Sequence, residues 1–209
     1  MGYDAVGLGR TEAYIDNGGY YIVAKALGLP IVAPESDSSN GSLPYIIKEI
    51  NGIKVGIAAF NTLTDSDDTF QTKKKCYAAY AAARKKSDIL IVLDQGNVIK
   101  EHWLRLLGKR LGAPDIVIGS EKNSGLKAPR IVGKTYSPPT SQKGATVGII
   151  DVEFVFGETP KFQFSQKELT KEILDDESIN TLIKEYEEKE QAASLITGAA
   201  EQASESKQQ

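Results

Sequence analysis

The sequence predicts an α/β fold in which mixed sheets are flanked by helices. Two continuous apolar runs, Asp88–Leu93 and Asp115–Gly119, are typical of parallel strands covered on both faces, and each follows a helical stretch. Beyond Gly119 short strands alternate with Pro- and Gly-bearing turns, which indicates an antiparallel meander. With 209 residues, of which 41% are hydrophobic and 25% charged, the chain is long enough for one large domain or for one domain with an appendage.

The chain begins with a predicted strand, helix and strand. Ala5–Gly9 is typical of a buried strand that ends in a Gly-rich turn. Tyr14–Leu27 has apolar residues at helical spacing, and Gly28 suits the end of a helix. Leu29–Ala33 is the short strand that follows, before a polar, turn-rich loop.

A hairpin is the firmest local prediction. The Asn51-Gly52 dipeptide favours a turn with two positive φ angles, and it separates the apolar segments Tyr45–Ile50 and Ile53–Phe60. Helices are predicted for Ala-rich Tyr77–Lys86 and for Val98–Leu111, each preceding one of the two buried parallel strands.

The C-terminal part is predicted to change from a meander to a helix and then to a tail. The expected strands are 130–133, 145–156 and 161–166, and the expected helix is 179–190. We therefore expect a partial domain over 1–166, a helical segment over 167–190 and a disordered tail or linker over 191–209.

Composition excludes several classes of protein and of site. No apolar run approaches the length of a membrane span, and the first residues lack the features of a signal peptide. The net charge is −3, and the largest basic run is three lysines, so nucleic acid is not an expected partner. The single cysteine, Cys76, cannot form an internal disulfide, and the single histidine, His102, cannot form a His-rich metal site. Both are expected to be ordinary helix residues.

Three short segments that follow predicted strands are the places where chemistry is expected. They are Gly9–Glu12, Asp94–Asn97 and Gly119–Asn123. In open α/β sheets, binding sites gather at the carboxyl ends of the strands, so polar side chains there can converge above the sheet.

Five blocks of sequence, taken in order, carry a resemblance to a known family. The blocks are Gly2–Gly9, Leu29–Ala33, Asn51–Ile57, Ser87–Leu93 and Pro114–Gly119. Together they resemble calcineurin-like metallophosphoesterases, and the branch they resemble most is the secreted 5′-nucleotidases of the UshA type. The resemblance implies a four-layered αββα sandwich, in which two metal ions polarise a phosphate ester and activate a bridging water.

The resemblance also implies which residues should form the site, and this chain departs from that pattern. In the family's Gly-Asn-His-Glu turn, Arg10 replaces the metal-binding asparagine, Thr11 replaces the histidine, and only Glu12 is retained. The histidine after the next buried strand corresponds to Gln95. The two metal-binding histidines of a Gly-His-Ser-His turn correspond to Glu121 and Asn123.

The family's earlier Asp-x-His and Gly-Asp blocks would lie before Met1, so the fold is expected to be N-terminally incomplete. Since bare amides compensate poorly for the water that a metal loses, we expect a non-catalytic domain acting as a binding or structural module, without a bound metal. Two alternatives stay open: a hydrolase whose missing ligands come from an upstream segment, and a truncated gene product without an independent role.

The residues at these degenerate positions have weaker alternative roles. Asp94, Gln95, Glu121 and Asn123 could supply oxygens to one Ca²⁺ or Mg²⁺ ion, or could simply form loop hydrogen bonds. Arg10 could bind an anion or pair with a local carboxylate.

The resemblance further suggests where the chain acts and with what. It implies a periplasmic or extracellular location. It also implies two more strands beside Ala5–Gly9, and without them an exposed sheet edge would favour self-association or an unknown protein partner.

Overall fold

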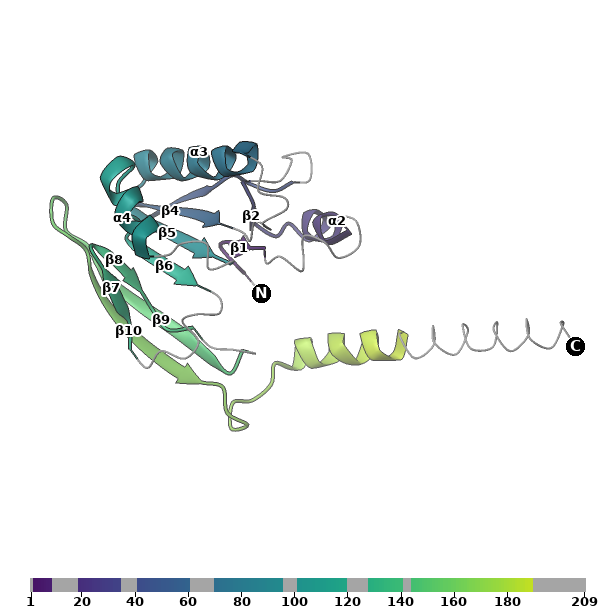
Figure 1. The fold of residues 1–209 in the computed structure, drawn as a ribbon. Helices are drawn as coiled ribbons and strands as arrows, with labels where there is room; N and C mark the ends of the chain where they lie inside the picture. Colours follow the sequence, from purple (N-terminus) through teal and green to yellow (C-terminus); the bar gives the residue numbers. More distant parts are fainter. Residues whose placement is uncertain are drawn as a thin grey trace, which may run out of the picture. The chain divides into compact units, whose positions relative to one another are not determined.

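The computed structural model describes residues 2–8, 19–34, 41–60, 70–95, 101–119, 128–140 and 144–189. The chain divides into two compact units, Met1–Glu168 and Leu169–Gln209. The first unit contains every labelled element of Figure 1.

A six-stranded sheet forms the centre of the first unit. Its strands, in spatial order, are β3 (Ile46–Ile50), β4 (Ile53–Phe60), β5 (Ile89–Asp94), β6 (Ile116–Gly119), β8 (Thr135–Ser137) and β7 (Arg130–Val132). Strands β4, β5, β6 and β8 pair in parallel, while β3 and β7 close the two edges as antiparallel partners. The β3–β4 hairpin confirms the prediction from the Asn51-Gly52 turn, whose φ angles are 52° and 79°.

Two helices cover one face of this sheet. They are α3 (Phe70–Lys86) and α4 (Glu101–Arg110), as Figure 1 shows. The alternating side chains Leu90 and Val92 of β5 pack beneath them with Tyr80 and Ala83 of α3 and Leu107 of α4. Tyr80, Ala83, Leu90 and Val92 are completely buried, so this layer is the main hydrophobic core.

The opposite face of the sheet is covered in part by a second, smaller layer. Strands β1 (Val6–Gly7) and β2 (Ile31–Val32) pair in parallel, and helix α2 (Gly19–Ala26) packs on them through Tyr21 and Ala24. Gly7 lies against Leu93 of β5. The order helix, sheet, sheet, helix is the αββα arrangement that the resemblance implies. Among the described strands, β1 pairs only with β2.

A long hairpin lies on the same face as β1 and β2. It consists of β9 (Thr146–Glu153) and β10 (Lys161–Glu168), paired antiparallel along their full length. The ring of Phe162 packs on that of Tyr136 in β8, with 5.1 Å between centroids. Ile118 of β6 also faces the hairpin, across a pocket described below.

The second unit contains a helix over residues 177–189. Asp176 caps its first turn, because its carboxylate accepts hydrogen bonds from the backbone N–H groups of Ser178 and Ile179. None of the described helices is both long and apolar enough to cross a membrane.

The observed elements differ from the predicted ones mainly in extent. Helix α3 begins at Phe70 and not at Tyr77, because its run of lysines continues the helix. The meander prediction omitted β8, which has only three residues and is held by antiparallel pairing with β7 and parallel pairing with β6. The prediction of a disordered tail over 191–209 falls outside the described residues.

Candidate functional site

The carboxyl ends of three parallel strands meet at one edge of the central sheet. Phe60 of β4 is the register partner of Asp94 in β5, and Asp94 is the partner of Gly119 in β6. Two of the three predicted site segments, those that begin at Asp94 and Gly119, therefore start side by side, where α/β proteins place their ligands. We call Phe60, Asp94, Gln95 and Gly119 the carboxyl edge.

Asp94 is the most buried polar side chain at this edge. Only 3% of it is exposed. Strand alternation places it on the face of Leu90 and Val92, which is the face that α3 and α4 cover. Asp94 is therefore directed toward the helical layer.

Gln95 lies on the other side of the sheet. Its backbone N–H donates to the carbonyl of Phe60 at 3.0 Å. Its side chain lies against β1 so closely that a Cβ atom added to Gly7 would be 2.9 Å from the amide nitrogen Nε2. Glycine at position 7 leaves room for this close approach, since an added Cβ would also be 3.2 Å from Cβ of Leu93. The strand β1, which precedes the first predicted site segment, thus lies against Gln95 of the second.

The structure locates only part of the predicted site. Arg10, Thr11, Glu12, Glu121 and Asn123 lie outside the described residues. Asp94 and Gln95, although adjacent in the chain, are directed to opposite faces of the sheet. Among the residues that the structure describes, no three His, Cys, Asp or Glu side chains are grouped closely enough to hold a metal ion.

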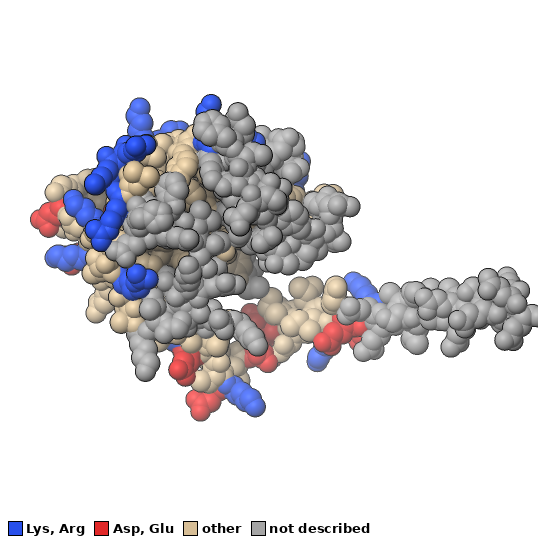
Figure 2. Space-filling model, viewed as in Figure 1, with Lys and Arg blue, Asp and Glu red and all other residues tan. Residues whose placement is uncertain are grey.

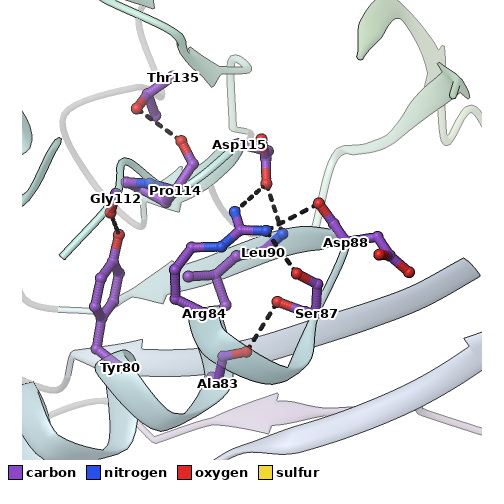
Figure 3. A network of polar contacts seen from close by, with 10 residues as sticks. All are labelled: Tyr80, Ala83, Arg84, Ser87, Asp88, Leu90, Gly112, Pro114, Asp115 and Thr135. Carbon is purple, nitrogen blue, oxygen red and sulfur yellow. Dashed lines mark hydrogen bonds and ion pairs between the residues drawn. The ribbon is translucent and has the colours of Figure 1, made fainter. Parts of the chain in front are cut away.

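A polar network that the sequence reasoning missed lies at the opposite, amino ends of the same strands (Figure 3). Asp115, just before β6, forms a 2.6 Å ion pair with Arg84 from the last turn of α3. The same carboxylate oxygen accepts the backbone N–H of Leu90 at 2.7 Å. Both charged side chains are about four-fifths buried, with 18% and 19% exposure.

Arg84 also joins the end of α3 to the start of β5. Its guanidinium donates to the backbone carbonyls of Ser87 and Asp88 at 2.8 and 2.9 Å. The Asp88 carboxylate in turn accepts the backbone N–H of Lys54 in β4 at 2.8 Å. An aspartate immediately before each apolar run was the sequence signal for these contacts.

Tyr80 extends the network into the core. Its hydroxyl donates to the carbonyl of Gly112 at 2.6 Å, in the turn between α4 and β6. Burial raises the pKa of Tyr80 far above its ordinary value; the nearby Arg84 lowers the pKa and Asp115 raises it. The phenol therefore stays neutral and acts as a donor. These hydrogen bonds and this ion pair connect α3 to the ends of the neighbouring strands, which is a structural role and not that of a reactive site.

An apolar pocket of about 190 Å³ lies between the sheet and the β9–β10 hairpin. Its lining residues are Ile118, Pro138, Pro139, Thr140, Thr146, Gly148, Ile150, Phe164 and Gln166. The side-chain amide of Gln166 donates to the Thr146 hydroxyl at 2.7 Å, and none of the lining residues is charged. The pocket lacks the groups that acid–base or metal chemistry requires.

Comparison with known proteins identifies the fold. No protein-family model matches the chain, and no curated protein sequence does. A candidate 5′-nucleotidase from Staphylococcus aureus, solved with α-ketoglutarate, is similar over 90% of this chain, with a TM-score of 0.60 and 14% identity. The sulfate thiohydrolase SoxB of Thermus thermophilus, solved with glycerol, is similar over 88% of this chain, with a TM-score of 0.65 and 14% identity.

A third similar structure is a hypothetical protein from Thermus thermophilus, matched over 80% of this chain and 77% of its own, with a TM-score of 0.52 and 14% identity. The chain covers only 42% of the S. aureus protein and 36% of SoxB. These likenesses establish the class of fold: the chain has the α/β sandwich of 5′-nucleotidase-type metallophosphoesterases.

Proposed function

We propose that this chain is a degenerate metallophosphoesterase-like domain, of the UshA-type branch, that acts as a binding or structural module and does not hydrolyse phosphate esters. The observation that carries the proposal is the presence of glutamine at position 95. This residue occupies the point after β5 where the resemblance implies a histidine, and its amide lies against Gly7 of β1. A neutral amide is a weaker ligand than imidazole for transition metals.

The described donor groups do not fit a dinuclear metal centre. Two dications about 3.5–4 Å apart need several converging anionic or imidazole ligands. Asp94 is buried on the helical side of the sheet, whereas Gln95 lies on the β1 side. The sequence adds Arg10 at a ligand position, where its positive charge would oppose metal binding. A second form of the proposal is a site for one Ca²⁺ or Mg²⁺ ion, for which the sequence suggests oxygens of Asp94, Gln95, Glu121 and Asn123.

The alternative function is metal-dependent hydrolysis with ligands supplied by an upstream segment. It is favoured by the limited coverage, since the chain spans less than half of the S. aureus protein and of SoxB. A periplasmic or extracellular location, implied by the same resemblance, belongs to both forms of the proposal.

Metal content and turnover together test the proposal. The purified chain, incubated with Mn²⁺ or Zn²⁺ and then dialysed, should retain no stoichiometric metal. It should hydrolyse p-nitrophenyl phosphate, bis-p-nitrophenyl phosphate and AMP no faster than buffer with metal. Two equivalents of metal per chain would contradict the proposal.

A matched pair of variants makes the activity test specific. Gln163, an exposed residue of β10, serves as the control position. If metal-dependent turnover is abolished by Gln95→Ala and preserved by Gln163→Ala, the chain is a hydrolase. Turnover that both variants retain would point to a contaminating phosphatase, and the proposal would then stand on the metal analysis.

A further inference from the structure

The helices that cover the central sheet bring together a basic surface that is not apparent in the sequence. α3 and α4 contain nine Lys and Arg residues and one Glu. Their exposed cations include Lys74, Lys75, Lys85, Lys86, Lys109 and Arg110, which we call the basic helical face. Figure 2 shows the blue side chains gathered over these two helices.

The outer side of α3 also carries small side chains between its lysines. Lys74, Ala78, Ala81 and Lys85 are separated by four, three and four residues, so they form one stripe along the helix. Ala78 is exposed and Ala81 is half-buried. Small side chains between lysines leave room for a third helix to pack closely, with cations at both ends of the contact.

The second unit has a helix with the complementary properties. On residues 177–189, Ile179, Leu182, Ile183 and Tyr186 follow the spacing of an apolar stripe. Leu182, Ile183 and Tyr186 are 62%, 48% and 65% exposed. Residues 169–189 carry seven acidic side chains and three lysines. Large apolar side chains on an acidic helix thus match small ones on a basic helix.

The two surfaces also match in length. The 13 residues of the C-terminal helix span about 20 Å, and Lys74 to Lys85 spans about 17 Å, at roughly 1.5 Å per residue. We propose that the chain forms a reciprocal dimer, in which the acidic C-terminal helix of each copy packs on the basic helical face of the other. This inference is independent of the proposed loss of catalysis.

A second copy is the proposed partner because every copy carries both surfaces, the acidic C-terminal helix and the basic helical face. Two copies can therefore satisfy both contacts at once in one closed, self-complementary dimer. A one-way contact would instead leave one helix and one face for a further copy, and would propagate into a ring or a filament.

The assembly state is tested first, by sedimentation velocity of the full chain over a concentration series in about 50 mM and 500 mM NaCl. We expect a dimer that weakens at least tenfold in high salt, because exposed charge pairs are screened. A monomer at every concentration in low salt would overturn the proposal.

Charge reversal then locates the contact. Lys74→Glu with Lys85→Glu should weaken dimerisation at least tenfold, and so should Glu185→Lys with Glu187→Lys. The control pair, Lys134→Glu with Lys167→Glu, makes the same change in net charge at exposed sites of the β7–β8 turn and β10, and should leave the dimer intact. Equal weakening by the control would overturn the assignment to α3.

Mixing the two reversed chains distinguishes exchange between copies from any contact within one copy. In the mixed dimer the reversed helix meets the reversed face and the native helix meets the native face, so an equimolar mixture should form a heterodimer of near wild-type affinity. Failure to form this heterodimer would contradict the proposal.

Leu182→Ala should weaken the dimer in low and high salt alike, because it removes apolar contact area. An unchanged affinity would exclude the apolar stripe of the C-terminal helix from the dimer contact.

Discussion

The two ends of the parallel strands β4, β5 and β6 are built in different ways. At the amino ends, Arg84 and Asp115 form a largely buried ion pair, and Arg84 and the more exposed Asp88 carboxylate bind neighbouring backbone groups. At the carboxyl ends, Gln95 is held by close packing against Gly7. The amino ends are held by the ion pair of Arg84 and Asp115, whereas the contact at the carboxyl ends relies on the missing side chain of Gly7. The carboxyl edge lies where open α/β sheets bind ligands, while charged contacts at the amino ends join helix α3 to the strands.

The largest expected effect is at the amino ends. Asp115→Ala removes the carboxylate from the buried Arg84 guanidinium and from the Leu90 N–H, and should lower the free energy of unfolding by about 3–5 kcal/mol. Urea denaturation measures it. Asp151→Ala, at an exposed position of β9, is the control. A loss below about 1 kcal/mol would mean that the network contributes little.

The carboxyl edge should respond to added volume. Gly7→Ala places a methyl group 2.9 Å from Nε2 of Gln95 and 3.2 Å from Cβ of Leu93, and should cost about 1–3 kcal/mol. Gln95→Ala should relieve part of this cost, so the double variant should be more stable than additivity predicts. Gly2→Ala, where no atom lies within 4 Å of the new methyl group, is the control. Strict additivity would show that β1 does not pack on Gln95.

Tyr80 gives the amino-end network a dependence on pH. Tyr80→Phe removes the hydrogen bond to Gly112 and should cost about 1 kcal/mol at pH 7. The folded pKa is raised, so the stabilisation is complete below the unfolded tyrosine pKa of 10.0 and falls as pH rises above it. Unfolding measured at pH 7 and about pH 10.5 should show a larger decline for the native chain than for the variant. An equal decline would exclude Tyr80 as the source.

The smallest effect is expected outside both ends, at the cap of the C-terminal helix. Hydrogen bonds from the Ser178 hydroxyl and from the N–H groups of Ile179 and Ser178 lower the pKa of Asp176 below its ordinary 3.8. Its capping contribution is thus present above that value and is lost as pH falls through the lowered pKa. Asp176→Ala should slightly reduce helical circular dichroism at pH 7, whereas Asp175→Ala should not. Identical spectra would show that the cap contributes nothing measurable.

Local signals in the sequence accounted for much of the fold. The Asn51-Gly52 turn and the alternating segments around it predicted the β3–β4 hairpin, because a two-residue turn sets the pairing of its own strands. The apolar runs that became β5 and β6 likewise predicted buried parallel strands, and the residues after them predicted the carboxyl edge. In contrast, β8 was missed, since three residues carry no periodicity and pairing with β6 and β7 makes them a strand.

The sequence by itself determined which residue types stand at the carboxyl edge, including the glutamine at position 95 and the lack of histidines there. Only the tertiary structure decided that Gln95 meets Gly7, that Arg84 meets Asp115, and that the cations of α3 and α4 share one face. The physical reason is the separation, along the chain, of the residues that interact. Turns and strand patterns depend on neighbouring residues, whereas these contacts join segments distant in the chain, which become neighbours when the apolar faces of helices and sheets pack together.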